Sequence, residues 1–295
     1  MTIQQLQDKA NEIREDIIKM LVTAGSGHSA GSLGMADVFT ALYFGEKLVL
    51  DPDHPWREDR DRIVLSCGHI CPVWYATLAH AGYFPVEELA TLRRLDSRLQ
   101  GHPQARLLPG IENSGGPLGQ GTSIAVGMAL ALRAKFKVQS SKFKVNRIPR
   151  VICITSDGEL DEGQTWEAAM CAAKNNLDNL TFITDRNDIQ IDGYTHDVMP
   201  LEPLAEKIGS FGFYPLSVNG HNIQEILNAL DFDLAIHRKP VWIIANTIPG
   251  KGVPYMENLP EWHGKPPMGP GEAVGAIEAI HALRTLGGRI VSEHQ

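Results

Sequence analysis

Short, uninterrupted apolar runs constrain the fold of this chain more than any other feature. They lie at 62–66, 151–155, 180–184 and 241–245. Continuous Val/Ile/Leu segments of this length are typical of parallel strands that are covered on both faces. Segments with helical spacing lie between them, at about 121–137, 164–176 and 222–236. Strands that alternate with helices predict an α/β fold, with a doubly wound, mostly parallel sheet and helices on both faces.

Further helices are expected near both ends of the chain. Apolar residues recur at helical spacing through 3–23, and this pattern stops at a Gly/Ser cluster that begins at Gly25. Helices are also expected at 35–44 and at 272–286. A length of 295 residues allows one or two domains, but no second complete α/β unit follows the last strand. We therefore expect a single domain over 1–295, with a C-terminal extension over about 260–295.

Composition narrows the possible function classes. The net charge of −8 disfavours a nucleic-acid-binding module. The 4 cysteines show no zinc-finger spacing and are expected to be buried, reduced thiols. With no apolar signal region and no long uncharged stretch, the chain is expected to be cytoplasmic and not to enter a membrane. A basic cluster at 135–150 is expected to be a solvated excursion rather than a binding patch.

Polar residues follow two of the predicted strands at their carboxyl ends. Asp157 and Gly158 follow the second strand, and Asn187 follows the third, 187 − 157 = 30 residues after Asp157. Ligands of parallel α/β sheets bind beyond the carboxyl ends of the strands. A carboxylate, an amide oxygen and a nearby backbone carbonyl suit Mg²⁺ or Ca²⁺ completed by phosphate oxygens and water. An Asp-Gly turn by itself is common, so it identifies no function alone.

A series of sequence motifs, in the same order as in a known enzyme family, runs along most of the chain. They are GSGHSAGSLGMADV (25–38), SCGH (66–69), LQGHP (99–103), GGPLGQG (115–121), SDGELDEGQ (156–164), DRNDIQIDG (185–193) and IPGKGV (248–253). From about residue 10 to 270, the chain resembles the diphosphate-binding half of transketolase, a thiamine diphosphate enzyme. Two positions depart from the family pattern: Ser156 replaces a glycine, and Ser29-Ala30 replaces Pro-Gly. Because serine is small, we expect the metal loop to be retained.

The resemblance implies roles for individual residues. Asp157, Asn187 and the carbonyl of Ile189 would hold Mg²⁺ or Ca²⁺, which would bridge the diphosphate of the cofactor. The resemblance and the loop positions also assign cofactor contacts to His69, Gly116, Pro117, Leu118, Gly158, Glu159 and His263. Substrate would be faced by His28, His102 and His263. Without the resemblance, each histidine would be interpreted as an ordinary surface or core residue.

The resemblance also implies a reaction and a partner. Transketolase transfers a two-carbon ketol unit from a ketose phosphate to an aldose phosphate, and His263 is a candidate base because histidine titrates near neutrality. Glu162, expected in the turn before a helix, and Glu167 match the acidic cluster at the family's subunit interface. The family's pyrimidine-binding and C-terminal domains, with the glutamate that activates the cofactor, have no counterpart in the sequence. We therefore expect a companion chain that carries them, in a heterotetramer with two copies of each chain.

Several alternatives remain open on the sequence. A deoxyxylulose-phosphate synthase shares the cofactor signature, although His102 favours transketolase. The α subunit of a 2-oxo-acid dehydrogenase is also a split chain, but there a second asparagine usually stands where this sequence has Asp188. The glycines at 116–121 lack the G-x-G-x-x-G order of nicotinamide-binding dehydrogenases. A non-catalytic partner is the alternative from a different class, and the motifs leave the sugars open.

Overall fold

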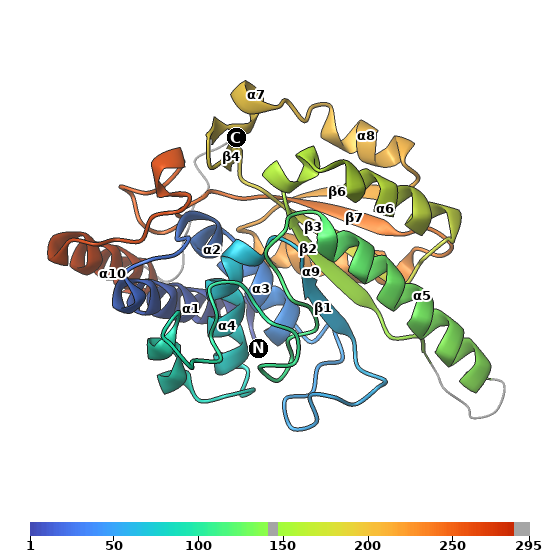
Figure 1. Cartoon of the computed structure of the whole chain (residues 1–295), viewed down its shortest axis with the longest axis horizontal. Coiled ribbons are helices and arrows are strands. Elements are labelled where there is room, and N and C mark those ends of the chain that lie inside the picture. Colours follow the sequence, from blue (N-terminus) through green and yellow to red (C-terminus); the bar gives the residue numbers. More distant parts are fainter. Residues whose placement is uncertain (141–146, 286–295) are drawn as a thin grey trace.

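A parallel sheet runs through the centre of the computed structural model, which describes residues 1–140 and 147–285 (Figure 1). Within these residues the sheet has 5 strands in the order β1-β2-β3-β7-β6. Their bounds are β1 (Arg62–Leu65), β2 (Val151–Ser156), β3 (Leu180–Arg186), β6 (Tyr214–Asn219) and β7 (Val241–Asn246). The predicted strands are confirmed as β1, β2, β3 and β7. Strand β6 was not predicted, because this edge strand is only partly buried and has no continuous apolar run.

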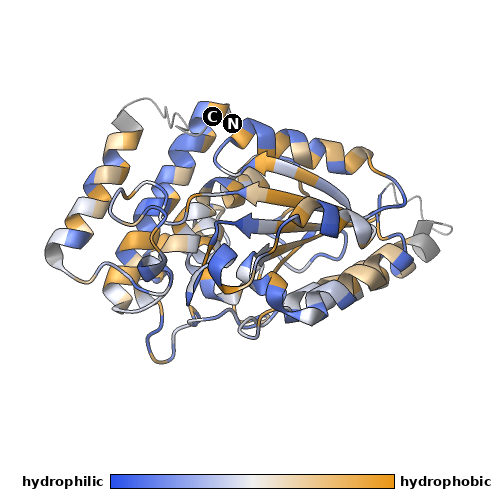
Figure 2. Cartoon of the chain, turned by 90° about the horizontal axis from the view of Figure 1, so that it is seen from above, coloured by the Kyte–Doolittle hydropathy of each residue, from blue (hydrophilic) through white to orange (hydrophobic). Residues whose placement is uncertain are grey.

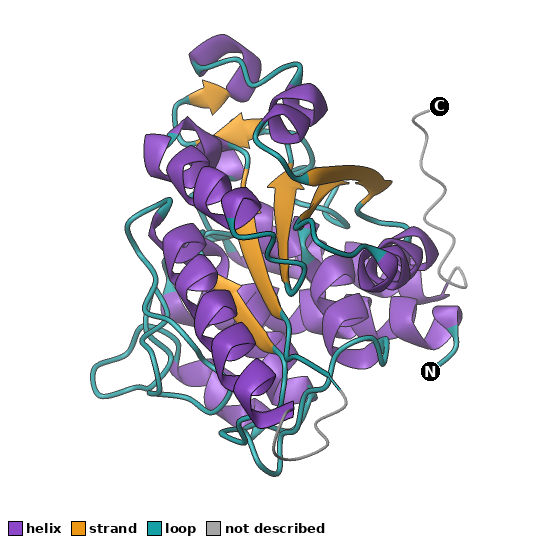
Figure 3. Ribbon diagram, turned by 90° about the vertical axis from the view of Figure 1, so that its right-hand side faces the viewer, coloured by secondary structure: helices purple, strands orange, loops and turns teal. Residues whose placement is uncertain are grey.

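Helices cover both faces of the sheet, which confirms the doubly wound prediction (Figure 3). They are α1 (Ile3–Ala24), α2 (Ala30–Gly34), α3 (Ala36–Phe44), α4 (Cys71–His80), α5 (Gln120–Ser140), α6 (Gly163–Lys174), α7 (Thr195–Val198), α8 (Leu204–Ser210), α9 (Ile223–Ala235) and α10 (Pro270–Thr285). Smaller elements are the 3₁₀ turns Gly68–Ile70, Val86–Thr91, Gly158–Asp161 and Pro260–Trp262, and a hairpin of β4 (Ile189–Gln190) and β5 (Gly193–Tyr194). Helix α4 was not predicted, because nearly all its residues are buried and apolar and its sequence therefore shows no helical period.

Alternate side chains of each central strand enter two separate hydrophobic cores. On β2, Ile152 and Ile154 join the core that contains residues of α1, α3 and α4. Val151 and Cys153 join the core that contains residues of α5, α6 and α8. Both faces of the strand are therefore buried, which is why its sequence is an apolar run rather than an alternation. Figure 2 shows the hydrophobic colouring of the sheet between the helices.

The first helix has strong signals at both ends, and these determine where the next loop begins. Thr2 caps its start: the Thr2 hydroxyl accepts a hydrogen bond from the backbone N–H of Gln5, and the Gln5 side chain accepts one from the backbone N–H of Thr2. Gly25 ends it with φ 66°, a left-handed conformation that favours glycine. The stop predicted at Gly25 is confirmed, and it places His28 in a loop just before α2.

The order of the strands determines where a ligand can bind. The crossover helices α5 and α6 contribute to one core, whereas α9, which connects β6 to β7, contributes to the other. The winding therefore changes between β3 and β7, which are hydrogen-bonded neighbours. Such a switch point is where ligands bind in open α/β sheets, beyond the carboxyl ends of the strands.

Two predictions about burial each fail at one residue. Cys171 is exposed on α6, whereas Cys67, Cys71 and Cys153 are buried, and all of these thiols are free. In the basic cluster at 135–150, Lys135 and Arg147 are exposed as expected, but Arg150 is buried and its guanidinium contacts Asp233. Lys142 and Lys144, in the same cluster, lie outside the described residues. No helix in the described part of the chain is long and apolar enough to span a bilayer.

Candidate functional site

A cavity of about 230 Å³ lies at the carboxyl-terminal edge of the sheet. It is lined by His28, His69, Gly116, Leu118, Ser156, Gly158, Asn187, Ile189, Gln190, Ile191 and His263. These residues come from loops that are far apart in the sequence, and most of them were predicted to be site residues. A larger, polar cavity of about 600 Å³ is lined by Arg186, Asp188 and His221, among others, and by none of the predicted site residues. We therefore take the smaller cavity as the functional site.

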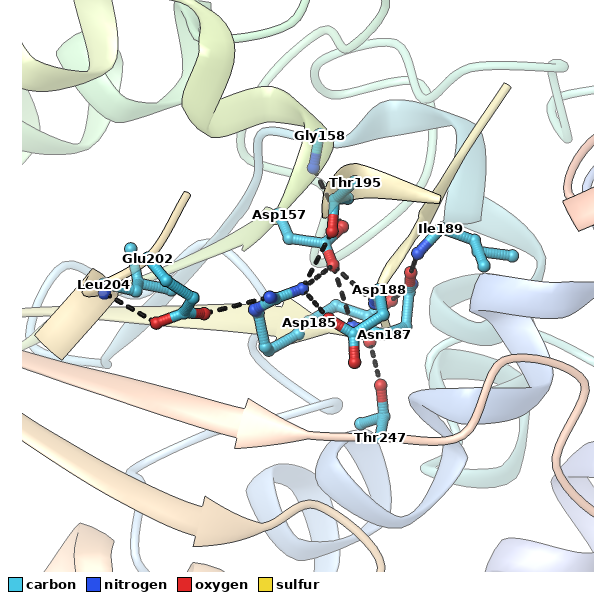
Figure 4. Close-up of polar contacts among 11 residues, drawn as sticks. Asp157, Gly158, Asp185, Asn187, Asp188, Ile189, Thr195, Glu202, Leu204 and Thr247 are labelled. Atoms are coloured by element: carbon cyan, nitrogen blue, oxygen red, sulfur yellow. Dashed lines mark hydrogen bonds and ion pairs between the residues drawn. The ribbon is translucent and has the colours of Figure 1, made fainter. Parts of the chain in front are cut away.

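Asp157, just beyond β2, is the centre of a hydrogen-bond network that joins β2 to β3 (Figure 4). Its Oδ1 accepts a hydrogen bond from the backbone N–H of Gly158 at 2.8 Å. Its Oδ2 accepts from the backbone N–H groups of Asn187 at 3.0 Å and Asp188 at 2.7 Å. Burial raises the pKa of Asp157 to about 6, although Arg186 and these backbone donors oppose the shift. The hydrogen bonds to both of its oxygens hold the Asp157 side chain in one orientation.

Asn187 is held on both sides of its amide. Its Nδ2 donates to Asp185 at 2.7 Å, and its Oδ1 accepts from the backbone N–H of Ile189 at 3.1 Å. Burial raises the pKa of Asp185 to about 7, and Thr247 also donates to this carboxyl group. The three residues expected to bind a cation, Asp157, Asn187 and Ile189, therefore lie together.

The donor set fits a hard divalent cation. Carboxylate, amide and carbonyl oxygens are the donors that Mg²⁺ and Ca²⁺ accept, with phosphate and water completing the coordination. Within the described ranges there is no group of three or more His, Cys, Asp or Glu side chains that could hold a metal. A cation here would therefore depend on amide and backbone oxygens, and on groups that a ligand brings.

Arg186 is a residue of this network that the sequence analysis missed. Its Nη1 donates to Asp157 and to Thr195, at 3.1 Å each, and also contacts Asp188. Its Nη2 donates to Glu202 at 3.0 Å. Arg186 therefore connects the Asp157 carboxylate to Thr195 and Glu202, in the segment that follows the β4–β5 hairpin. Figure 4 labels these three partners of Arg186. The signal was its place beside Asn187 in the DRND motif, but the sequence does not show which carboxylates it meets.

Rings of His28, His69 and His263 form a cluster in the cavity. Their centroids are 5.1 Å apart for His28 and His69, 5.2 Å for His69 and His263, and 5.7 Å for His28 and His263. Burial, followed by the charge of neighbouring histidines, lowers the pKa of His28 to about 4 and that of His69 well below its usual value. These two rings are therefore neutral at pH 7. The buried Nδ1 atoms of His28 and His263 have no hydrogen-bond partner in the described structure.

Ser29, one of the departures from the family pattern, connects two of these histidine segments. It is fully buried, and its hydroxyl lies 3.1 Å from the carbonyl oxygen of Trp262 and 2.6 Å from that of Lys265. Its neighbour His28 is thereby held against the segment that carries His263. The sequence showed the substitution, but not the carbonyl groups that the hydroxyl meets.

The glycine-rich loop before α5 closes another side of the cavity. Gly116 has φ 138°, and a Cβ built on it would meet nothing within 4 Å, so this backbone is open to a ligand. The carbonyl oxygen of Leu118, a residue expected to contact the cofactor, accepts a hydrogen bond from Gln164 Nε2 at 2.9 Å. Gln164 ends the motif at 156–164, but no role was assigned to it from the sequence.

Other predicted site residues lie outside the cavity lining. Pro117 and His102 are exposed close to it. Glu162 lies at the N-cap of α6, which confirms its place before the helix, and Glu167 lies on that helix; both are exposed. Asp157 and Glu159 are both fully buried, and neither lines the cavity. Asp157 stands between the lining residues Ser156 and Gly158, whereas the carboxylate of Glu159 accepts hydrogen bonds from Ser66 and from the backbone of Gly119.

Arg93 is another residue that was missed. Its Nη1 donates to Ser26 at 3.3 Å, and a Cβ built on Gly101 would come within 3.1 Å of its Nε. Its positive charge contributes, after burial, to lowering the pKa of both His28 and His102. Arg93 therefore places a cation beside two histidines that were expected to face substrate. It belongs to no matched motif, so no local signal pointed to it.

A parallel α/β sheet with an oxygen-donor loop and a histidine-lined cavity at its carboxyl edge defines a cofactor-binding domain. The family model described as "Transketolase, thiamine diphosphate binding domain" matches residues 5–279. The chain belongs to the transketolase family. This membership supports thiamine diphosphate binding and a transketolase-type function, and it confirms the family named from the motifs.

Curated relatives of similar length are named as transketolase subunits. The chain is 45% identical over 253 residues to the 6-deoxy-6-sulfo-D-fructose transketolase subunit SqwG of Clostridium sp. (strain MSTE9), an alignment that covers 85% of this chain and 88% of that protein. It is 37% identical over 270 residues to one of the subunits of the apulose-4-phosphate transketolase of Actinobacillus succinogenes, covering 91% of this chain and 94% of that protein.

Solved transketolases share the fold but are longer. The transketolase of Campylobacter jejuni superposes with a TM-score of 0.82 at 32% identity, covering 97% of this chain and 48% of that one. The transketolase of Leishmania mexicana gives a TM-score of 0.82 at 29% identity, covering 97% of this chain and 46% of that one. This chain therefore spans a little under half the length of these enzymes.

Proposed function

We propose that this chain is the N-terminal, diphosphate-binding subunit of a two-chain transketolase, which transfers a two-carbon ketol unit from a ketose to an aldose. The observation that supports this most is the cavity itself: Asn187 and Ile189 of the oxygen-donor loop line it together with His28 and His263, whose buried Nδ1 atoms have no partner in the described structure. Relatives of similar length that are named as transketolase subunits support the same proposal.

Different residues of this chain would bind the cation and the thiamine diphosphate. Asp157, Asn187 and the Ile189 carbonyl would hold Mg²⁺ or Ca²⁺. His69, Gly158 and His263 would contact the diphosphate. The loop of Gly116, Pro117 and Leu118 would line the rest of the cofactor. When bound, the cofactor supplies stabilisation of the negative charge that develops on the transferred carbon.

Neutral histidines suit the proton transfers that this reaction needs. At pH 7 the imidazoles of His28 and His263 are unprotonated, since burial lowers the pKa of both. An unprotonated ring nitrogen can accept a hydroxyl proton from the sugar and return it later. We propose His263 as the base, with His28 and His102 binding the sugar hydroxyl groups.

The substrate of this proposal is a sugar with an anionic end. Arg93 makes no ion pair with a carboxylate among the described residues, although it lies beside His28 and His102. The names of the two relatives refer to 6-deoxy-6-sulfo-D-fructose and to apulose-4-phosphate, and each of these sugars carries an anionic group, a sulfonate or a phosphate. A guanidinium binds either group through paired hydrogen bonds.

The companion chain of this proposal carries the pyrimidine-binding and C-terminal domains, and two copies of each chain form a heterotetramer. In this view residues 1–295 are one diphosphate-binding domain, and Glu162 and Glu167 face an interface. Both glutamates are exposed in the single chain. Burying them against a partner is costly unless they meet hydrogen-bond donors there or share protons.

Reconstitution tests this proposal. The purified chain should show no ketol transfer, and addition of a companion chain of the transketolase C-terminal type should restore it. Asp157→Ala should weaken thiamine diphosphate binding in Mg²⁺, measured by calorimetry, by more than about a hundredfold, since even outer-shell partners of a metal are worth about 10–100-fold. Asp188→Ala is the matched control, because Asp188 pairs with the same arginine but is 63% exposed.

The two experiments test different claims of the proposal. Full ketol transfer by this chain alone would refute the two-chain arrangement. Unchanged cofactor affinity in Asp157→Ala would refute the metal site, whatever the activity of the mixture.

A further inference from the structure

Glu159 follows Gly158 directly in the chain, but its carboxylate is buried behind the cavity. The side chain is 0% exposed and does not line the cavity. Its Oε1 accepts hydrogen bonds from the Ser66 hydroxyl and from the backbone N–H of Gly119, the latter at 2.5 Å. Its Oε2 accepts from the backbone N–H of Ser156 at 3.3 Å. One carboxylate thus contacts three separate segments of the chain.

Each of these partners belongs to a segment that forms the cavity. Ser66 follows β1 and stands 69 − 66 = 3 residues before His69. Gly119 directly follows Leu118, which lines the cavity from the glycine-rich loop. Ser156, at the end of β2, lines the cavity itself. The hydrogen bonds of Glu159 therefore connect three segments that form the cavity: the one before His69, the glycine-rich loop, and the end of β2 before Asp157. The carboxylate itself lies outside the cavity lining.

Backbone contacts between these segments leave little room for independent movement. A Cβ on Gly68 would lie 2.9 Å from the backbone nitrogen of Gly116, and one on Gly121 would lie 2.5 Å from the Cα of Ser66. Segments packed this closely move together, because protein interiors lack the free volume for one to shift alone. The carboxylate of Glu159 lies at the junction of these contacts.

We propose that Glu159 is a positioning residue for cofactor binding: its carboxylate fixes the His69 segment, the Gly116–Leu118 loop and the Asp157 loop relative to one another. This role replaces the direct cofactor contact that was expected of Glu159. It rests on the proposed function, because it takes the cavity to be the diphosphate site.

Two substitutions at Glu159 test this role in the full chain mixed with its companion chain. Glu159→Ala leaves the N–H groups of Gly119 and Ser156 without their acceptor. Affinity for thiamine diphosphate in Mg²⁺ should fall about 10–100-fold by calorimetry, the equivalent of one or two buried hydrogen bonds. Glu159→Gln should lose less, because its amide oxygen still accepts a hydrogen bond from Gly119. Circular dichroism at the same temperature checks that both variants are folded.

Asp61→Ala is the matched control for a loss of stability alone. Asp61 is also 0% exposed, and it accepts backbone hydrogen bonds from Val49 at 2.8 Å and Arg150 at 2.6 Å. These contacts lie at the opposite end of the sheet, before β1 and β2 begin. Asp61→Ala should therefore lower the unfolding temperature and leave cofactor affinity within about twofold of wild type.

Three results would overturn the role of Glu159. They are unchanged affinity in Glu159→Ala, an equal loss in Asp61→Ala, and a loss in Glu159→Gln as large as in Glu159→Ala, which would assign the effect to charge rather than position. A wild-type mixture that fails to bind thiamine diphosphate would instead refute the proposed function, so the two failures are distinguishable.

Discussion

Within the described residues, a polar cluster around His221 differs from the cluster of His28, His69 and His263 in how its polar atoms are satisfied. His221 lies between Asp37, whose Oδ2 is 2.8 Å from its Nδ1, and the backbone N–H of Ile248, which donates to its Nε2 at 2.7 Å. Arg14 completes this cluster with an ion pair to Asp37 at 2.5 Å. In the cavity, by contrast, the Nδ1 atoms of His28 and His263 are buried without a partner in the described structure.

The comparison distinguishes buried polar groups that stabilise the fold from buried polar groups that remain available to a ligand. Burial raises the pKa of Asp37, but Arg14 and His221 outweigh this and hold it at about 2, so the group stays charged and paired. Burial lowers the pKa of His28 to about 4, and no carboxylate opposes the shift. A polar atom left unpaired in the interior is costly, so its retention favours a role in binding.

The largest effect is expected from Asp37→Ala, which removes the carboxylate of the structural cluster. The substitution leaves Arg14 as a buried charge without its partner, at a cost of about 3–5 kcal/mol of unfolding free energy. Urea denaturation measures this loss. Cofactor affinity at a temperature where the variant is folded should be unchanged. A loss under about 1 kcal/mol would show that solvent reaches Arg14 and that this cluster is not a structural one.

A smaller effect is expected from His28→Ala and His102→Ala, and it should appear in function rather than stability. Each lost hydrogen bond to a buried sugar hydroxyl is worth about 1–3 kcal/mol, or about 10–100-fold in kcat/KM of the reconstituted enzyme. Unfolding free energy should change little, because neither ring is part of a saturated network. Wild-type kinetics in either variant would remove that histidine from the site.

The smallest expected effect is a pH dependence of the unfolding free energy that arises from His28 in the cavity. The pKa of His28 falls from an ordinary 6.5 to about 4 on folding. Below pH 6.5 the unfolded chain therefore binds a proton that the folded chain does not, and stability falls as the pH drops towards 4. The contribution of Asp37, whose pKa is lowered, is present above its ordinary value of 3.8 and is lost only as the pH falls towards 2.

His28→Asn isolates this contribution. Because His28 is only partly buried, its share of the change between pH 6.5 and 4 should be on the order of 1 kcal/mol after solvent screening. Urea denaturation at several pH values should show a shallower slope in the variant than in wild type. Parallel curves would mean that the His28 ring is protonated in the folded chain.

The sequence alone determined those parts of this protein that have a local signal. Central strands appear as apolar runs, and α1 ends at the predicted Gly25 because backbone conformation and capping act over a few residues. The grouping of Asp157, Asn187 and Ile189 was predictable for a related reason: carboxyl ends of neighbouring parallel strands meet at one edge of the sheet.

Only the tertiary structure decided where individual side chains point. Glu159 stands next to the metal loop in sequence, yet the fold turns its carboxylate towards Ser66 and Gly119. The edge position of β6, the burial of Arg150 and the exposure of Cys171 likewise had no local signal. In each case the neighbours come from distant parts of the chain, and burial is a property of those neighbours rather than of the residue itself.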